Sequence, residues 1–214
     1  MVTRAQLSQE RSRLRRDELL AAAIELFAEG GSRAITHRAV AAKAGLPPAT
    51  TTYYFESIGD LIREALGAHV TQWIRDLDAL AAVEDAADVN LDDAAGFIEL
   101  VFSQRGPEVA ALELSIFLAA AREPQLRDLA DAALHSFEGL AAALMARVGV
   151  AESADLAASV VALIAGTALR RQAGVYTEQD EARLLAGAIR SLVAAHAIGP
   201  EAVDQAIAGL RQLQ

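Results

Sequence analysis

Apolar residues recur every three or four positions along most of the chain, and this spacing predicts helices. In residues 13–27, Leu19, Ala23 and Phe27 share one helical face, and Gly30-Gly31 supplies a stop signal. Strand-like alternation is absent from the sequence, and the good helix formers Ala, Leu, Glu and Arg dominate it. The pattern therefore predicts an all-α fold.

Capping residues and helix breakers divide this pattern into elements. Thr36 is expected to cap a short helix that Gly45 ends, and Pro47-Pro48 opens a second short helix. Ser57 is expected to cap a long helix that runs to Leu80, and residues 83–90 are expected to form a loop. Further helices are predicted over residues 92–104, 108–121, 125–148, 154–172, 178–197 and 201–213. The predicted architecture is three N-terminal helices followed by a larger helical bundle.

Charge is distributed unevenly along the 214 residues. The net charge is −10, which alone argues against nucleic acid because DNA is itself a polyanion. Residues 1–60, however, hold eight basic and seven acidic residues, and residues 1–16 hold five arginines and a single glutamate. The acidity belongs to the C-terminal two-thirds, so contact with DNA at the N-terminal end remains open. The arginine-rich leader itself is expected to be a disordered, solvated arm rather than a minor-groove reader.

Composition excludes several classes of protein. There is no cysteine, which excludes a disulfide scaffold and a thiolate metal site. No uninterrupted apolar run approaches the roughly 18 to 20 residues that span a bilayer, and residues 1–16 lack the apolar region of a secretory signal. We therefore expect a cytoplasmic protein with no membrane partner.

Residues 36–55, with the sequence THRAVAAKAGLPPATTTYYF, predict a helix-turn-helix. Small Ala41 lets the two short helices approach closely, and Gly45 can adopt the positive φ of the sharp turn. Val40, Ala44 and Leu46 would then form the inner face. In such a motif the second helix enters the major groove of DNA.

Candidate DNA-binding residues lie at the N-terminal ends of the two short helices. Hydroxyl groups of the second helix can contact base edges or phosphates, and the N-terminus of a helix favours the binding of phosphate. Tyr54 and Phe55 are expected in the core of the small domain rather than on DNA. The candidate residues are Thr36, His37, Arg38, Pro48, Ala49, Thr50, Thr52 and Tyr53.

The same segment resembles the TetR-type transcriptional regulators. Their pattern of an apolar helix, a threonine, V/I-A-x-x-A-G-V/L and Y-Y-x-F is matched by Phe27, Thr36, Val40-Ala41, Ala44-Gly45-Leu46 and the segment 50–55, with Ser57 and Leu61 following. The resemblance implies a helix-turn-helix DNA-binding domain over residues 11–70 and a ligand-binding and dimerisation domain over residues 71–214. It further implies a homodimeric repressor that a small-molecule inducer releases from a palindromic double-stranded DNA operator.

Two departures from the family pattern affect the expected contacts with phosphate, and the second of them, together with the net charge of −10, keeps an alternative open. Thr52 stands where family members often have an aromatic residue, and Ile58 stands where they often have a lysine, so one interaction with phosphate is weakened and another is missing. The alternative is an all-α small-molecule binding or interaction protein that has lost DNA binding. The sequence also leaves open whether the regulator represses or activates.

The resemblance places a ligand pocket among the middle helices and a dimer interface at the last two large helices. Candidate lining residues are Trp73, Phe97, Phe102, Glu113, Phe117 and Tyr176. Glu113 lies on an apolar helical stripe, so its carboxylate needs an internal partner such as Arg122 or Arg170, or a cationic ligand. The helices 154–172 and 178–197 are expected to pair with their copies in the homodimer.

Signatures of catalysis are missing from the sequence. It contains no GxSxG, GxxxxGK[ST] or GxGxxG motif, and its four histidines have no metal-ligand spacing. We therefore predict no enzymatic activity, no catalytic residue, no metal and no cofactor.

Overall fold

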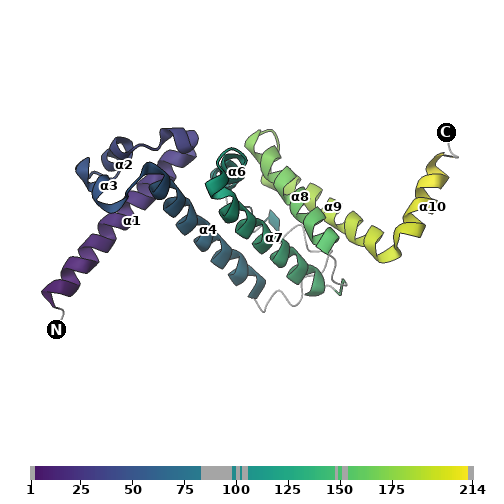
Figure 1. The fold of residues 1–214 in the computed structure, drawn as a ribbon. Coiled ribbons are helices and arrows are strands. Elements are labelled where there is room, and N and C mark those ends of the chain that lie inside the picture. Colours follow the sequence, from purple (N-terminus) through teal and green to yellow (C-terminus); the bar gives the residue numbers. More distant parts are fainter. Residues whose placement is uncertain are drawn as a thin grey trace. The chain divides into compact units, whose positions relative to one another are not determined.

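The structure is a computed structural model that describes residues 3–82, 98–99, 102, 106–147, 149–150 and 154–211. All regular structure in these residues is helical, which confirms the all-α prediction (Figure 1). Two short 3-10 helices, η1 and η3, cover Gly31–Ala34 and Pro124–Leu126. The α-helices are α1 (Arg4–Gly30), α2 (His37–Lys43), α3 (Ala49–Tyr54), α4 (Ile58–Ala82), α6 (Pro107–Ala120), α7 (Arg127–Arg147), α8 (Ala154–Gln172), α9 (Glu178–Ile198) and α10 (Pro200–Arg211).

The predicted caps of the N-terminal helices are confirmed. The Thr36 hydroxyl accepts a hydrogen bond from the Ala39 amide at 3.1 Å, and the Ser57 hydroxyl accepts one from the Asp60 amide at 3.1 Å. Each bond satisfies an amide that has no partner inside its helix. Short polar side chains thus set the starts of α2 and α4, as their sequence positions predicted.

The expectation of a disordered N-terminal arm is wrong. Helix α1 begins at Arg4, and Thr3 and Gln6 form a capping box in which each side chain accepts a hydrogen bond from the backbone of the other. This cap starts the helix nine residues before the predicted Arg13, and good helix formers continue it. The arginines of residues 11–16 therefore project from an ordered helix.

The later helices follow the predicted pattern closely. Helix α8 has the predicted bounds, and the bounds of α6, α9 and α10 differ from the predicted ones by at most two residues at either end. The predicted helix over 125–148 is divided into η3 and α7. The predicted loop at 83–90 and most of the predicted helix at 92–104 lie outside the described residues. No single helix in the described part of the chain is long and apolar enough to cross a membrane, and the pair α9–α10, which passes only jointly, is bent by 110°.

The chain divides into two compact units. The first unit comprises residues 1–75 and 112–133, and its interior is formed by Leu19, Ala23, Phe27, Val40, Phe55, Leu61, Leu66, Val70, Trp73, Ile116 and Leu126. Helices α1, α2 and α3 meet the N-terminal part of α4 here (Figure 1). The second half of α6 and the start of α7 belong to the same unit. The predicted boundary between domains at residues 70–71 stays a prediction.

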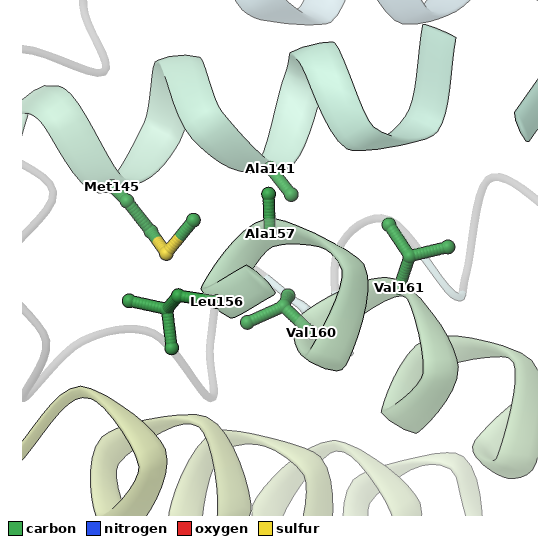
Figure 2. Close-up of a cluster of buried hydrophobic side chains, with 6 residues drawn as sticks. All are labelled: Ala141, Met145, Leu156, Ala157, Val160 and Val161. Atoms are coloured by element: carbon green, nitrogen blue, oxygen red, sulfur yellow. The ribbon is translucent and has the colours of Figure 1, made fainter. Parts of the chain in front are cut away.

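The second unit comprises residues 76–111 and 134–214. Figure 2 shows one of its cores, where Ala141 and Met145 of α7 meet a face of α8 formed by Leu156, Ala157, Val160 and Val161. A second cluster joins Phe102 to Ala182 and Leu185 of α9. The small side chains of Ala141 and Ala157 let α7 and α8 pack closely. The residues of α8 on its other side are exposed.

Candidate nucleic-acid interface and ligand-binding region

The turn between α2 and α3 has the geometry that its sequence predicted. Gly45 has φ +66°, a left-handed conformation that costs glycine little, and the Leu46 amide donates to the Ala41 carbonyl at 2.9 Å. Val40 and Ala41 are fully buried, whereas Ala44 and Leu46, which were also predicted on the inner face, are half-buried. The turn therefore holds α3 at a fixed angle on α2 and exposes its outer side.

Thr51 secures this angle, and sequence analysis missed it. It is fully buried, and its hydroxyl lies 3.1 Å from the Pro48 carbonyl and 3.3 Å from the His37 carbonyl, so it can donate to either. The hydroxyl links α3 to the first turn of α2. One signal could have found it, because Thr51 lies four residues before buried Phe55 and so shares its helical face.

The predicted DNA-binding residues lie at the N-terminal end of α2 and along α3. The Tyr53 side chain is 80% exposed, and its ring meets that of Tyr54 edge-on with centroids 5.0 Å apart. His37 and Thr50 are half-buried. The other five candidates are exposed: Thr36, Arg38, Pro48, Ala49 and Thr52. This part of the first unit thus offers hydroxyls, one guanidinium and an exposed phenol to solvent.

The aromatic residues after Tyr53 face inward. Phe55 is buried, with 4% of its surface exposed, as predicted. Tyr54 is half-buried, and its hydroxyl is hydrogen-bonded to that of Ser12 on α1 at 3.1 Å. The Arg16 guanidinium lies 5.2 Å from the centre of the Phe55 ring. The end of α3 is therefore anchored to α1, while Tyr53 remains outside.

Lys43 and Arg16 are among the basic residues of the first unit that pair with carboxylates of the same unit. Lys43, the last residue of α2, pairs with Glu29 at 2.8 Å and Glu25 at 3.0 Å on α1, and hydrogen bonds to these two groups raise its pKa. Arg16 donates to both carboxylate oxygens of Glu64 on α4. Less positive charge is thus available to an approaching polyanion than the residue count suggests.

Three of the predicted ligand-binding residues lie in the first unit. The rings of Trp73 on α4 and Phe117 on α6 meet edge-on, with centroids 6.1 Å apart. Glu113 lies one helical turn before Phe117 and is only 9% exposed. It shares its face of α6 with buried Ala110 and Ile116. A carboxylate thus stands on an apolar helix face beside an aromatic pair.

Phe102 and Tyr176 lie in the second unit, and each is covered by an arginine. The Arg171 guanidinium lies 4.3 Å from the centre of the Phe102 ring, and that of Arg170 lies 4.6 Å from the centre of the Tyr176 ring. Phe102 is buried, whereas Tyr176 is 55% exposed on the turn between α8 and α9. Phe97 lies outside the described residues. The six candidates therefore divide between the two units.

The second unit contains an ion pair that sequence analysis missed. Arg170 donates three hydrogen bonds to Glu181 at 3.0 to 3.2 Å, and the Glu181 side chain is only 1% exposed. The bonds to Glu181 raise the pKa of Arg170. The sequence suggested Glu113 as a partner for Arg170, but these bonds go to Glu181. A signal was present, because Glu181 precedes Ala182 and Leu185 on the inward face of α9.

Two family models match this chain. Residues 19–65 match bacterial regulatory proteins of the tetR family, and residues 90–195 match the tetracyclin repressor-like C-terminal domain. Together the two matches cover well over half of the chain. The chain belongs to the TetR family. It is a transcription regulator with a helix-turn-helix DNA-binding segment and a C-terminal ligand-binding domain, and regulators of this family are generally not enzymes.

Solved structures resemble this TetR-family chain over most of its length. A protein of Streptomyces coelicolor A3(2), described as a transcriptional regulator, is 26% identical, with a TM-score of 0.64 over 85% of this chain and 99% of its own. The multidrug binding protein EbrR, complexed with proflavin, is 28% identical, with a TM-score of 0.61 over 83% and 99%. A Mesorhizobium loti protein of the TetR family, 16% identical with a TM-score of 0.67 over 86% and 97%, shares the fold. No curated protein matches the chain significantly.

Proposed function

We propose that this TetR-family chain is a homodimeric repressor that binds a palindromic operator and that a small-molecule inducer releases. DNA would be bound by the domain at residues 11–70, through Thr36, His37, Arg38, Pro48, Ala49, Thr50, Thr52 and Tyr53. The observation that carries the proposal is the exposure of Tyr53 on a helix held outward by the Gly45 turn and the buried Thr51. A helix presented in this way has the size and polarity that the major groove accepts.

The alternative is an all-α binding protein that no longer binds DNA. Two observations favour this alternative: Lys43 and Arg16 form ion pairs with carboxylates of the chain itself, and the net charge is −10. The ordered helix α3 argues the other way, because its exposed side carries Tyr53, 80% exposed, where a recognition helix contacts the major groove. We therefore favour operator binding with few phosphate contacts, which gives a shallow dependence on salt.

The inducer is proposed to bind in the C-terminal domain, residues 71–214, near Trp73, Glu113 and Phe117. For Phe97, Phe102 and Tyr176 a role in ligand binding stays a prediction from the sequence, because Phe102 and Tyr176 belong to the second unit and Phe97 lies outside the described residues. EbrR is complexed with proflavin, ethidium and malachite green, which are aromatic cations. In this chain the Trp73–Phe117 pair offers aromatic surface, and Glu113 places a carboxyl group one helical turn before Phe117 on α6. An aromatic cation suits this combination, because its rings can stack on aromatic side chains and its charge is attracted by them.

The homodimer is proposed to form through α8 and α9. Each helix buries one face in its own unit and leaves apolar as well as polar residues exposed. The exposed residues on α8 include Ala158, Ala162, Ala165, Gly166 and Leu169, and those on α9 include Leu184, Gly187, Ala194 and Ile198. Small residues let helices from two subunits approach closely, and a two-fold axis would present two recognition helices to a palindrome.

Selection of genomic DNA fragments by the purified protein tests the proposal. The selection is run at about 150 mM salt, near physiological ionic strength. A double variant, Thr50→Ala with Tyr53→Ala, serves as the control because both side chains lie outside the core. We expect enrichment of a two-fold-symmetric sequence that the double variant loses. A folded dimer that enriches nothing, even after denaturing removal of bound ligand and refolding, would establish the alternative.

Dye binding tests the ligand site independently of DNA. Trp73 is the single tryptophan and is 2% exposed, so its emission reports events in its surroundings. We expect ethidium to quench it, and Glu113→Gln to weaken that binding about tenfold through loss of the carboxyl group. Glu108→Gln, on the exposed start of the same helix, is the matched control. Equal affinities for the two variants would remove Glu113 from the site.

A further inference from the structure

Arg16 on α1 joins three elements of the first unit. Its Nη2 donates to Glu64 Oε2 on α4 at 2.7 Å, and its Nη1 donates to Glu64 Oε1, which makes the pair bidentate. The same guanidinium lies 5.2 Å from the centre of the Phe55 ring. Bidentate pairs and contacts of guanidinium with aromatic faces both fix the plane of the arginine side chain.

Phe55 is the C-cap of the recognition helix α3, directly after its last residue, Tyr54. It closes the last turn of the helix, because its amide donates to the Thr51 carbonyl at 2.9 Å, and its ring is buried. A group that fixes the Phe55 ring therefore fixes the C-terminal end of α3. The hydrogen bond between Tyr54 and Ser12 ties the same turn to α1 at a second point.

The location of Arg16 suggests a different role at first. It belongs to the arginine-rich segment 11–16, whose charge would attract phosphate. The Arg16 and Glu64 side chains are 41% and 34% exposed, so neither is sealed from solvent. Their bidentate geometry nevertheless uses both ends of the guanidinium fork, and a phosphate would have to displace Glu64 to use them.

We propose that Arg16 is a positioning residue for DNA recognition, which acts by locking the end of α3 to α4 through Phe55 and Glu64 rather than by contacting phosphate. The inference rests on the proposed operator binding. It assigns Glu64, an acidic residue in a DNA-binding head, a role in favour of DNA binding. Electrostatics alone would have the Glu64 carboxylate weaken DNA binding, so an experiment can distinguish positioning by Glu64 from repulsion of DNA by its charge.

Operator titrations of charge variants test the role. Glu64→Gln removes a negative charge, which by electrostatics alone would tighten DNA binding. Positioning predicts the opposite, about tenfold weaker binding for Glu64→Gln and for Arg16→Gln, since both remove the same charge-assisted pair. Arg16→Lys keeps the charge but loses the bidentate fork, and it should weaken binding as well. Glu18→Gln, an exposed carboxylate on α1, is the matched control.

The salt dependence gives a second readout on the same variants. If Arg16 bound a phosphate of the operator directly, Arg16→Gln would lower the slope of log affinity against log salt by about 1. Positioning predicts an unchanged slope. Tighter binding by Glu64→Gln, or a reduced slope for Arg16→Gln, would overturn the proposal and make Arg16 a phosphate-binding residue.

Hydrogen exchange of residues 49–55 tests the lock without DNA. We expect faster exchange in Arg16→Gln and Glu64→Gln, an unchanged rate in Glu18→Gln, and unchanged exchange in α9, which reports on the second unit. Unchanged exchange in α3 would overturn the lock whatever the DNA result. If the wild-type protein selects no DNA, operator binding fails, and the exchange of α3 alone decides whether Arg16 positions that helix.

Discussion

At the scale of single residues, Thr51 shows how a polar group stabilises an apolar interior. Its side chain is fully buried, yet its hydroxyl can donate to the Pro48 carbonyl or the His37 carbonyl. A buried hydroxyl costs free energy unless it is hydrogen-bonded, and here the bond also joins α3 to α2. The position thus needs both the size of threonine and its donor.

Thr51→Val keeps the shape and removes the donor. We expect the first unit to lose about 1 kcal/mol of unfolding free energy, the typical net value of one hydrogen bond, measured in urea by the emission of Trp73. Thr52→Val is the control, because Thr52 is exposed and its hydroxyl bonds only within α3, to the Ala49 carbonyl. A Thr51→Val protein as stable as Thr52→Val would show that shape alone holds the turn.

At the scale of elements, the contacts that could be predicted from the sequence are those between residues close together in the chain. Thr36, Ser57 and Gly45 act on backbone within a few residues, so their effects on helix ends could be predicted from the sequence. The pairing of Arg16 with Glu64 and of Arg170 with Glu181 could not be predicted, because the choice of partner depends on how helices pack. The sequence indicates only that Glu181 lies on the inward face of α9. The candidate DNA-binding residues come from the same local pattern and stay a prediction, whereas Arg16 and Glu64, which pair across helices, give no signal in the sequence.

Gly45 and Gly59 make a matched pair for the glycine turn. Gly45 has φ +66° and open space where a Cβ would lie, so Gly45→Ala costs backbone strain alone, about 1–2 kcal/mol. Gly59 lies in the first turn of α4, where a Cβ would meet Ser57 Oγ at an ordinary 3.6 Å, so Gly59→Ala should stabilise the unit by up to about 1 kcal/mol. Urea unfolding followed by Trp73 emission compares them. If both substitutions changed the free energy of unfolding in the same direction, the turn would not require glycine at Gly45.

The contact between α4 and the start of α7 should make stability depend on pH. Arg63 donates to both oxygens of Asp128, one at 2.9 Å, and to the Gln125 carbonyl. These hydrogen bonds hold the pKa of Asp128 below its ordinary value. Its contribution is therefore present above the unfolded-state pKa of about 3.9 and is lost as the pH falls through the lower folded value.

Unfolding in urea between about pH 2.5 and pH 6 measures this linkage. We expect Asp128→Asn to flatten the acid limb of the stability profile, and Arg63→Gln to flatten it to the same extent. The double variant should add nothing, because both changes remove one pair. If the unfolding free energy of the wild-type protein and that of Asp128→Asn changed with pH in parallel, the Arg63–Asp128 pair would not contribute to the pH dependence of stability.

At the scale of the whole molecule, the acidic C-terminal two-thirds sets limits on how DNA can be bound. Residues 61–214 hold 22 acidic and 11 basic residues, so repulsion from DNA favours contact through the N-terminal head alone. One head offers a single six-residue recognition helix, α3. Two heads fixed by a dimer interface would double the contact and select a palindrome, so operator affinity and dimerisation should be lost together.

Leu184→Asp tests that link. Leu184 is 50% exposed on α9, and in the proposed dimer the substitution would bury a carboxylate from each subunit. We expect the dimer dissociation constant to rise at least about tenfold, measured by sedimentation over a range of concentrations, with a parallel loss of operator affinity. Leu118→Asp, at a leucine 62% exposed on α6, makes the same chemical change outside the proposed interface and should alter neither quantity. If Leu118→Asp dissociated the dimer instead, the interface would involve α6. If the Leu184→Asp protein still bound the operator when fully monomeric, one DNA-binding head would be sufficient.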